Sequence, residues 1–252
     1  MSLEPHSKTE LVETLHQYLG IIRDAPTAIC YKEFLTRDEN GLERRLGIFG
    51  EVHRANSSES SIAKKVIETY EHFAVEGATK IPLSLKLISL AFIPAVLSYM
   101  IATKRTFPAA STLLKKHPSA PHHSLEDHDI QLFSFSQLCA IGITGLYASV
   151  VSPYNYWYLK KYGDPNIPGT QAYEKEMQEK ESGKKGIMSR ISEYSLEKNR
   201  SQRDQRMAER TAEICQQEQS GNLLVVVGRK HLDGVVENLS KKLSLTERFS
   251  YP

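Results

Sequence analysis

Two histidines each stand three positions after a glycine that ends an aliphatic run. The first run ends in GEVH at 50–53 and the second in GRKH at 228–231. The glycines, Gly50 and Gly228, allow the chain to turn sharply at a strand end. If both runs are parallel strands, both imidazoles lie above the carboxyl edge of one sheet, where open α/β folds bind their ligands. The pair therefore predicts a shared site at that edge.

Acidic residues accompany both histidines. Glu51 lies two residues before His53, and Glu76 ends another apolar run. Imidazole nitrogens bind zinc, manganese, cobalt or iron, and a carboxylate usually completes such a ligand set. A bound divalent ion lowers the pKa of its water to about 7, and a neighbouring glutamate can take the proton. We therefore expect His53, His231 and Glu76 to share one metal ion, with the two rings about 4–7 Å apart.

The first part of the chain predicts a β-hairpin followed by a strand–helix–strand unit. A helix is expected at 8–20. Apolar runs at 27–36 and 42–50 then flank a turn cluster that ends in Asn40-Gly41, which is typical of a hairpin. A helix capped by Ser57 or Ser58 leads into a strand at 72–77.

The last part of the chain predicts one strand in the interior of a sheet. The aliphatic run at 222–228 suits a strand covered on both faces, and a final helix is expected near 231–243. The fold class we predict is α/β, with a small and mostly parallel sheet, flanking helices and a two-helix hydrophobic insert. The strands that carry the histidines lie on either side of that insert.

Four motifs occur in an order that is found in one protein family. They are GEVH (50–53), FAVEG (73–77), RDQRMAERTAEI (203–214) and LLVVVGRKHLDGV (223–235). Together they resemble the TraB/PrgY family, and the wider clan of Tiki proteases, erythromycin esterases and haem-binding ChaN proteins. The resemblance covers roughly 42–80 and 197–243. The first motif has Glu51 where the commoner TraB form has threonine, and is more like the ChaN and erythromycin-esterase members.

The resemblance implies a metal-dependent hydrolase that acts on a peptide or a small ester. By position, His53 and His231 are metal ligands, Glu76 is an acidic ligand or partner, and Arg203 is an electrophilic or orienting group. Glu51 is then a ligand or a base. The expected cofactor is a divalent manganese, cobalt or zinc ion. The alternative is a non-catalytic protein of the same clan that binds or sequesters a signalling peptide or haem.

Arg203 and Asp204 lie in a charge-dense segment at 171–220 that is almost free of proline. Opposite charges four residues apart in this segment support solvated helix, which Gly183 and Gly186 divide in two. The alternative for Arg203 is an ion pair in solvent. The alternative for Asp204 is a local cap or pair.

Two long uncharged runs interrupt the predicted α/β fold, at 87–103 and 130–159. The second ends in tyrosines and the tryptophan and is followed at once by two lysines, which is typical of a transmembrane helix where it leaves the bilayer. About twenty apolar residues cross a bilayer. We therefore expect 83–103 and 131–158 to form two long antiparallel helices that anchor the protein in a membrane. The alternative is a cap over the site in a cytoplasmic protein.

The predicted organisation has three parts: 1–80 and 162–252 form the two halves of the α/β domain, and 81–161 is the hydrophobic insert. A histidine-rich stretch within the insert matches no metal-ligand spacing and is interpreted as a solvated loop. Its members are His117, His122, His123 and His128.

Composition limits the function classes. The 252 residues have a formal net charge of +2, so bulk electrostatic binding of nucleic acid is not expected. The three scattered cysteines suggest neither a disulfide framework nor a metal knuckle. The first residues lack the apolar region of a secretory signal peptide. The oligomeric state is not readable from these patterns.

Overall fold

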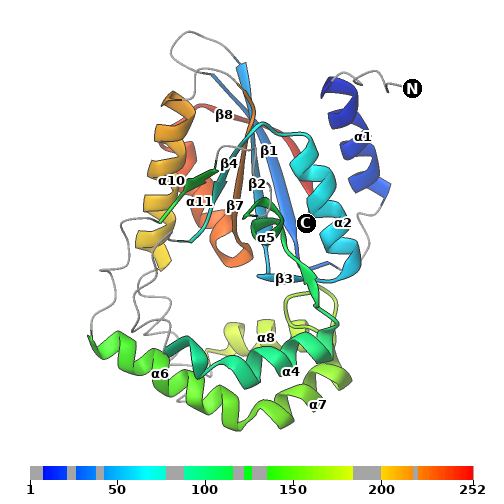
Figure 1. Cartoon of the computed structure of the whole chain (residues 1–252), viewed down its shortest axis with the longest axis vertical. Coiled ribbons are helices and arrows are strands. Elements are labelled where there is room, and N and C mark those ends of the chain that lie inside the picture. Colours follow the sequence, from blue (N-terminus) through cyan, green and yellow to red (C-terminus); the bar gives the residue numbers. More distant parts are fainter. Residues whose placement is uncertain are drawn as a thin grey trace.

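The computed structural model describes residues 8–21, 27–37, 43–77, 88–115, 122–126, 135–183, 200–217 and 221–251, and shows an α/β fold (Figure 1). The strands are β1 (Cys30–Arg37), β2 (Glu43–Glu51), β3 (Arg54–Ala55), β4 (His72–Val75), β5 (Phe107–Pro108), β6 (His122–Ser124), β7 (Leu223–Gly228) and β8 (Leu245–Tyr251). The helices are α1 (Lys8–Ile21), α2 (Ser57–Glu68), α4 (Ile93–Thr103), α5 (Ala110–Lys115), α6 (Phe135–Val150), α7 (Ser152–Tyr162), α8 (Gln171–Ser182), α10 (Arg200–Gln217), the 3₁₀ turn η2 (Arg229–His231) and α11 (Leu232–Ser240).

The main sheet has six strands in the order β6-β4-β7-β2-β1-β8. Strands β6, β4, β7 and β2 are parallel neighbours, whereas β1 pairs antiparallel with both β2 and β8. This confirms the predicted α/β class with a mostly parallel sheet. The expected hairpin strands also pair, with Cys30 opposite Gly50, while its turn at 38–42 lies outside the described residues.

Strand β7 is the centre of the parallel part. It pairs with β2 on one side, where Ile48 lies opposite Val225, and with β4 on the other, where Ala74 also lies opposite Val225. Its side chains alternate between two hydrophobic clusters, one on each face of the sheet. The continuous aliphatic sequence is thus explained, because both faces of β7 are covered by helices.

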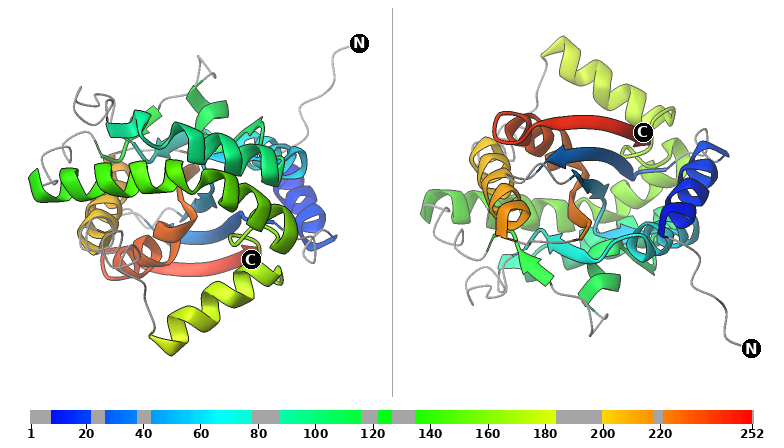
Figure 2. Two further views of the ribbon diagram at one scale, coloured as in Figure 1. Left: turned by 90° about the horizontal axis from the view of Figure 1, so that it is seen from below. Right: turned by 90° about the horizontal axis from the view of Figure 1, so that it is seen from above.

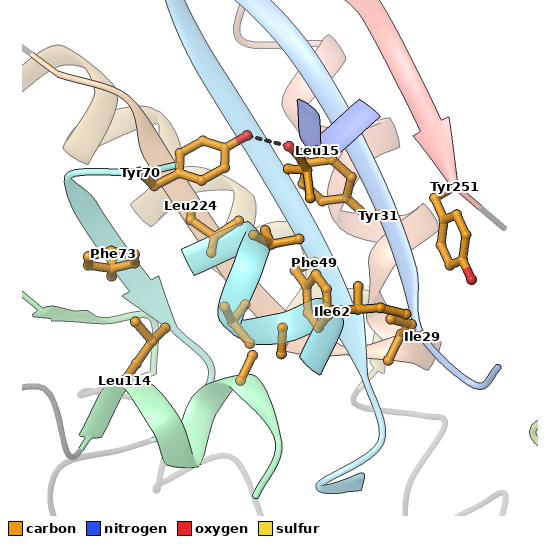
Figure 3. Packing of buried hydrophobic residues seen from close by; sticks show 14 of the residues in the cluster. Leu15, Ile29, Tyr31, Phe49, Ile62, Tyr70, Phe73, Leu114, Leu224 and Tyr251 are labelled. Atoms are coloured by element: carbon orange, nitrogen blue, oxygen red, sulfur yellow. Dashed lines mark hydrogen bonds between the residues drawn. The ribbon is translucent and has the colours of Figure 1, made fainter. Parts of the chain in front are cut away.

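The two clusters use different helices. Side chains of α1, α2 and α5 pack on one face, where Leu224, Val226 and Phe49 are buried (Figure 3). On this face the hydroxyls of Tyr31 and Tyr70 lie 2.6 Å apart and form a hydrogen bond. On the other face, α10 and α11 cover Ile48 and Val225 among others. Seen from above, α1 and α10 lie on opposite sides of the strands (Figure 2).

Helix α2 shows how local sequence sets an element's start. Asn56 accepts a hydrogen bond from the backbone N–H of Glu59, and the Glu59 carboxylate accepts one from the backbone N–H of Asn56. This reciprocal capping box satisfies two N–H groups that a helix start leaves without partners. The sequence interpretation placed the cap one or two residues later, at Ser57 or Ser58.

The histidine-rich stretch is not entirely a loop. His122 and His123 lie in β6, which pairs in parallel with β4 at the sheet edge, so the solvated-loop interpretation is wrong for these two residues. Strand β6 forms because the backbone groups on the outer side of β4 pair with those of residues 122–124. His117 and His128 lie outside the described residues.

The hydrophobic insert forms a helical layer of α4, α6 and α7, which lies across the carboxyl end of the parallel strands (Figures 1 and 2). The predicted membrane hairpin is wrong: among the helices that the structure describes, none has the length and hydropathy needed to cross a bilayer. The second apolar run is divided between α6 and α7 at 151–152, with Pro153 in the first turn of α7. Parts of both predicted helices, at 83–87 and 131–134, lie outside the described residues.

The charge-dense segment is helical at both of its described ends. Helix α8 ends at Ser182, just before Gly183, whose φ of 65° is a left-handed conformation that favours glycine. Helix α10 then begins at Arg200. Gly186, the second predicted boundary, lies outside the described residues.

A buried arginine joins the helical layer to the α/β part of the molecule. Arg105 follows α4 and is 1% exposed. Its Nη2 donates to Glu59 Oε1 at 2.9 Å, and its Nε donates to Asp164 Oδ2 at 2.7 Å. Because Glu59 belongs to α2 and Asp164 follows α7, this one guanidinium holds three segments together. The layer is therefore fixed to the sheet by charge as well as by packing.

Candidate functional site

Polar side chains collect at the carboxyl edge of the parallel strands. Glu51 is the last residue of β2 and lies opposite Gly228, the last residue of β7. Glu76 follows β4, and its backbone N–H donates to the Val226 carbonyl at 2.8 Å. Glu126 lies two residues after the end of β6. Parallel strands thus bring three acidic residues from distant parts of the sequence to one edge.

His231 lies among these carboxylates at the end of the η2 turn. Its Nδ1 forms a short hydrogen bond with Asp204 Oδ1, and its Nε2 lies 3.7 Å from Glu76 Oε1. The side chain is 12% exposed. Because the carboxylate of Asp204 can only accept a hydrogen bond when ionised, we assign the Nδ1 proton to His231. Nε2 then faces the edge where the strands end.

Arg203 bridges two of the carboxylates. Its Nε donates to Glu126 Oε1 at 2.6 Å, and its Nη2 donates to Glu76 Oε1 at 2.8 Å. Arg203 and Asp204 are neighbours in the first turns of α10, so one helix end supplies both the guanidinium and the carboxylate that contacts His231. The helix therefore orients Glu76 and His231 at the same time.

Glu76 is the most heavily contacted member of the cluster. Besides Arg203, the backbone N–H of Gly228 donates a short hydrogen bond to its Oε2. Burial raises the pKa of the Glu76 carboxyl, but the charge of His231, the Gly228 N–H and the charge of Arg203 together lower it below its usual value. A Cβ at position 228 would lie 3.1 Å from Glu76 Oε2, so the glycine permits this close approach.

Glu51 has a different environment at the same edge. The Ser111 hydroxyl of α5 donates a short hydrogen bond to its Oε1, and the Ser111 N–H lies 3.3 Å from Oε2. The residue is 3% exposed. Burial raises the pKa of the Glu51 carboxyl, and the hydrogen bonds from Ser111 and the charge of His53 only partly oppose that rise. The two glutamates thus have pKa values shifted in opposite directions.

His53 lies on the exposed side of the cluster. The charge of His53 lowers the pKa of both Glu51 and Glu76, and His231 Nε2 lies 3.7 Å from Glu76 Oε1. The charges of both histidines therefore act on Glu76. The two GxxH motifs also pack against each other. A Cβ added at Gly50 would lie 3.2 Å from the Arg229 Cα, inside the second motif. The fold therefore brings the two motifs to one place, as their positions after strands predicted.

The predicted metal-binding group is wrong. Within the ranges that the structure describes, no three His, Cys, Asp or Glu side chains are arranged to hold a metal ion. The contacts explain why: the Arg203 cation lies between Glu76 and Glu126, and Asp204 and Glu76 lie at opposite nitrogens of the His231 ring. The carboxylate oxygens therefore bind a guanidinium and an imidazole in place of converging on one point.

Sequence reasoning ranked Asp204 too low and did not single out Glu126 or Ser111. Asp204 is three and four positions before Met207 and Ala208, both fully buried, so helical spacing places it on the face of α10 that packs on the sheet. A Cβ at position 234 would lie only 2.0 Å from Asp204 Oδ2. The absence of a side chain at Gly234 of α11 therefore leaves space for this carboxylate. We find no comparable sequence signal for Glu126 or Ser111.

Comparisons of the chain with protein-family models, with curated proteins and with solved structures find no match. The resemblance to the TraB/PrgY family therefore stays a prediction that rests on the four motifs. The catalytic roles assigned to Glu51, Glu76 and Arg203 stay predictions as well.

Proposed function

We propose that the chain is a hydrolase that cleaves a peptide or ester bond, with His231 as the general base. The observation that carries the proposal is the hydrogen bond between His231 Nδ1 and Asp204, with Nε2 turned to the carboxyl edge of the sheet. A carboxylate that holds Nδ1–H orients the ring and stabilises the imidazolium that forms when Nε2 takes a proton. The same reaction class is implied by the TraB-like motifs.

The proposed reaction adds one water molecule across the scissile bond. A water molecule gives a proton to His231 Nε2 while its oxygen forms a bond with the carbonyl carbon of the substrate. When the tetrahedral intermediate collapses, the carbon–nitrogen or carbon–oxygen bond breaks, and the leaving group takes the proton from Nε2. The products are a carboxylic acid and an amine or an alcohol.

The other members of the cluster act on His231 or on the substrate. The Glu76 carboxylate, 3.7 Å from Nε2, stabilises the imidazolium by its charge. Arg203 is a positioning residue, because it holds Glu76 and Glu126 in place. His53 is exposed and its charge acts on Glu76, so we assign it to contact with a bound substrate.

The test measures hydrolysis of two substrate sets by the purified full-length chain: p-nitrophenyl esters of short acids, and a mixture of fluorogenic peptides. We expect His231→Gln to lower kcat/KM by about 10²–10⁴-fold. Asp204→Asn is expected to lower kcat while it leaves KM nearly unchanged, because Asp204 acts through His231. Lys230→Ala is the matched control, since Lys230 is exposed and directly precedes His231 in the same turn.

Two results contradict the proposal: neither substrate set is hydrolysed by the wild-type chain, or His231→Gln is as active as the wild type. The predicted alternative gives a separate result. A protein that only binds its ligand shows a Soret band with added haem, or retains a peptide unchanged, and His231→Gln weakens that binding.

A further inference from the structure

The large apolar side chains that remain exposed are concentrated in one part of the molecule. Among the described residues, twelve large hydrophobic side chains are exposed, and eleven of them lie within 90–101 and 143–157. These ranges belong to the helical layer and the turn that leads into it. Val150 is 79% exposed and Leu146 is 63% exposed. Monomeric soluble proteins rarely leave a contiguous apolar patch of this kind uncovered.

The layer has a definite shape and position. Seen from below, α4, α6 and α7 run across the underside of the molecule, on the side away from the sheet (Figure 2). Helix α6 packs closely on the start of α4, since a Cβ at Gly145 would lie 2.7 Å from the ring of Phe92, the residue that precedes α4. Tyr99 of α4 donates a hydrogen bond of 2.9 Å to Asp164, which follows α7. The helices thus form a fixed surface whose outer side chains are apolar.

The charges of the layer indicate what covers it. Helices α4 and α6 contain no charged residue, and α7 contains two, Lys160 and Lys161, both at its end. Lys161 Nζ lies 4.9 Å from the centre of the Trp157 ring, and Lys160 Nζ lies 5.3 Å from that of Tyr156. Aromatic rings beside lysines at the border of an apolar face are typical of a surface that enters the headgroup region of a bilayer.

We propose that the helical layer binds the surface of a membrane that contains anionic lipids. The helices have 11, 16 and 11 residues, so they lie in the plane of the interface and do not cross it. The exposed side chains enter the acyl-chain boundary, while Lys160 and Lys161 contact lipid phosphates. This surface is separate from the proposed reaction and does not depend on it.

The chain contains its own probe for this contact. Trp157 is the only tryptophan of the sequence, and it is 51% exposed at the border of the layer. Insertion at a bilayer is expected to shift its emission to shorter wavelength. Lipids brominated on their acyl chains are expected to quench that emission. Binding of a second protein copy also shifts the emission, but it gives no quenching by brominated lipid.

The experiment mixes the full-length protein with phosphatidylcholine vesicles, with or without about 30% phosphatidylglycerol. Co-sedimentation and Trp157 quenching are measured together. We expect the wild-type chain to bind both kinds of vesicle. It is expected to bind the anionic vesicles at least about tenfold more tightly, because each lysine near an anionic surface raises the affinity about fivefold. Leu146→Glu with Val150→Glu is expected to lower binding to both vesicles at least about tenfold.

Lys160→Glu with Lys161→Glu is expected to lower binding to the anionic vesicles only. Its matched control is Lys241→Glu with Lys242→Glu, a second lysine pair at the opposite end of the sheet, next to the start of β8. This control is expected to bind as the wild type does. All four positions carry exposed lysines, and Leu146 and Val150 are exposed too, so the variants are expected to keep the circular dichroism spectrum of the wild type. The control variant also loses the exposed ion pairs of Lys241 with Glu237 and of Lys242 with Glu209, which is expected to lower Tm only slightly.

The proposal is overturned if the wild-type chain stays in the supernatant with both vesicles, or if brominated lipid does not quench Trp157. It is also overturned if Leu146→Glu with Val150→Glu binds as the wild type does. A dimer in light scattering that this double variant dissociates, without vesicle binding, assigns the layer to a second copy of the chain.

Discussion

Two arginines in this molecule each lie between two carboxylates, one inside the fold and one at the candidate site. Arg105 contacts Glu59 and Asp164, and its side chain is 1% exposed. Arg203 contacts Glu76 and Glu126, and its side chain is 25% exposed. The chemical groups are nearly the same in the two clusters. Their surroundings are different.

The difference between the two clusters distinguishes a structural contact from a chemical one. The carboxylates of the Arg105 cluster are at most 4% exposed, and they connect segments that would otherwise separate. In the Arg203 cluster, an imidazole that can exchange protons lies against Glu76, and solvent reaches the edge. A buried arginine between acids is therefore informative about function only together with its access to solvent and its titratable neighbours.

The largest effect on stability is expected for Arg105→Met. Removing the guanidinium leaves Glu59 and Asp164 buried without their cation, which typically costs about 3–5 kcal/mol of unfolding free energy. Urea unfolding at pH 7, followed by circular dichroism, measures the loss. A change below about 1 kcal/mol would contradict the structural role that we give to this cluster. Wild-type protein and Arg203→Met serve as references.

Arg203→Met is expected to affect activity more than stability. Because this cluster is partly open to water, the loss of unfolding free energy is expected to be about 1–3 kcal/mol. Under the proposed function, kcat is expected to fall about 10–100-fold with little change in KM, since Arg203 positions Glu76 without contacting substrate. Arg203→Lys is expected to restore little, because an ammonium cannot reproduce the two-sided contact. Equal stability losses for Arg105→Met and Arg203→Met, with full activity in both, would contradict the division into a structural cluster at Arg105 and a functional cluster at Arg203.

The two glutamates of the edge are expected to respond oppositely to pH. The pKa of Glu51 is raised in the fold, so its contribution to stability is present below the unfolded-state pKa and is lost as pH rises through the folded-state pKa. Glu51→Gln should therefore stabilise the chain at pH 7, by less than Arg203→Met destabilises it. This gain should disappear below about pH 4.3.

Glu76 has the opposite sign, because its folded-state pKa is lowered. Its contribution is present above the unfolded-state pKa and is lost as pH falls through the folded-state pKa. Glu76→Gln should therefore destabilise the chain at pH 7, and the difference from wild type should shrink in acid. Urea unfolding of both variants across pH 3–7 measures the two trends, and trends of the same sign would refute the contrast.

The smallest effect is expected for Arg210→Ala. Arg210 lies on α10, the helix of Arg203, and its contact with Glu213 joins side chains that are 42% and 55% exposed. Exposed pairs of this kind contribute little, so the unfolding free energy should change by less than about 0.5 kcal/mol. The Tm in a thermal scan checks this. A larger loss would show that solvent exposure does not predict how much each arginine of this chain contributes to the unfolding free energy.

Much of the sheet could be predicted from local patterns, whereas the contacts of the site could not. The aliphatic run of β7 and the two Gly-x-x-His endings correctly placed Glu51, Glu76 and His231 at one edge, because strand ends are visible in sequence. The partner of Glu76 depends on how α10 and β6 pack, and no local pattern encodes that. The number of possible ligands at this edge predicted a metal ion. The sequence does not show that the Arg203 guanidinium lies between the carboxylates of Glu76 and Glu126.

The helical layer shows a second limit of sequence patterns. Hydropathy counts apolar residues over a window and does not register where a helix stops. The run at 130–159 is long enough to span, yet α6 ends at Val150 and α7 begins at Ser152. The tyrosines, Trp157 and the lysines were interpreted as the belt of a spanning helix, but they lie on α7, which has 11 residues. What they border is a surface of short helices.

The position of β7 has a consequence for how the chain folds. This strand lies at the centre of the parallel part of the sheet, yet it follows the helical layer in the sequence. Strand β2, which contains Ile48, therefore has no partner on its β7 side until Val225 and its neighbours have been synthesised. During synthesis, the apolar helices leave the ribosome before the strand that completes the sheet. Contacts of such high sequence separation fold slowly. The nascent protein therefore exposes an incomplete sheet edge and its most apolar surface at the same time.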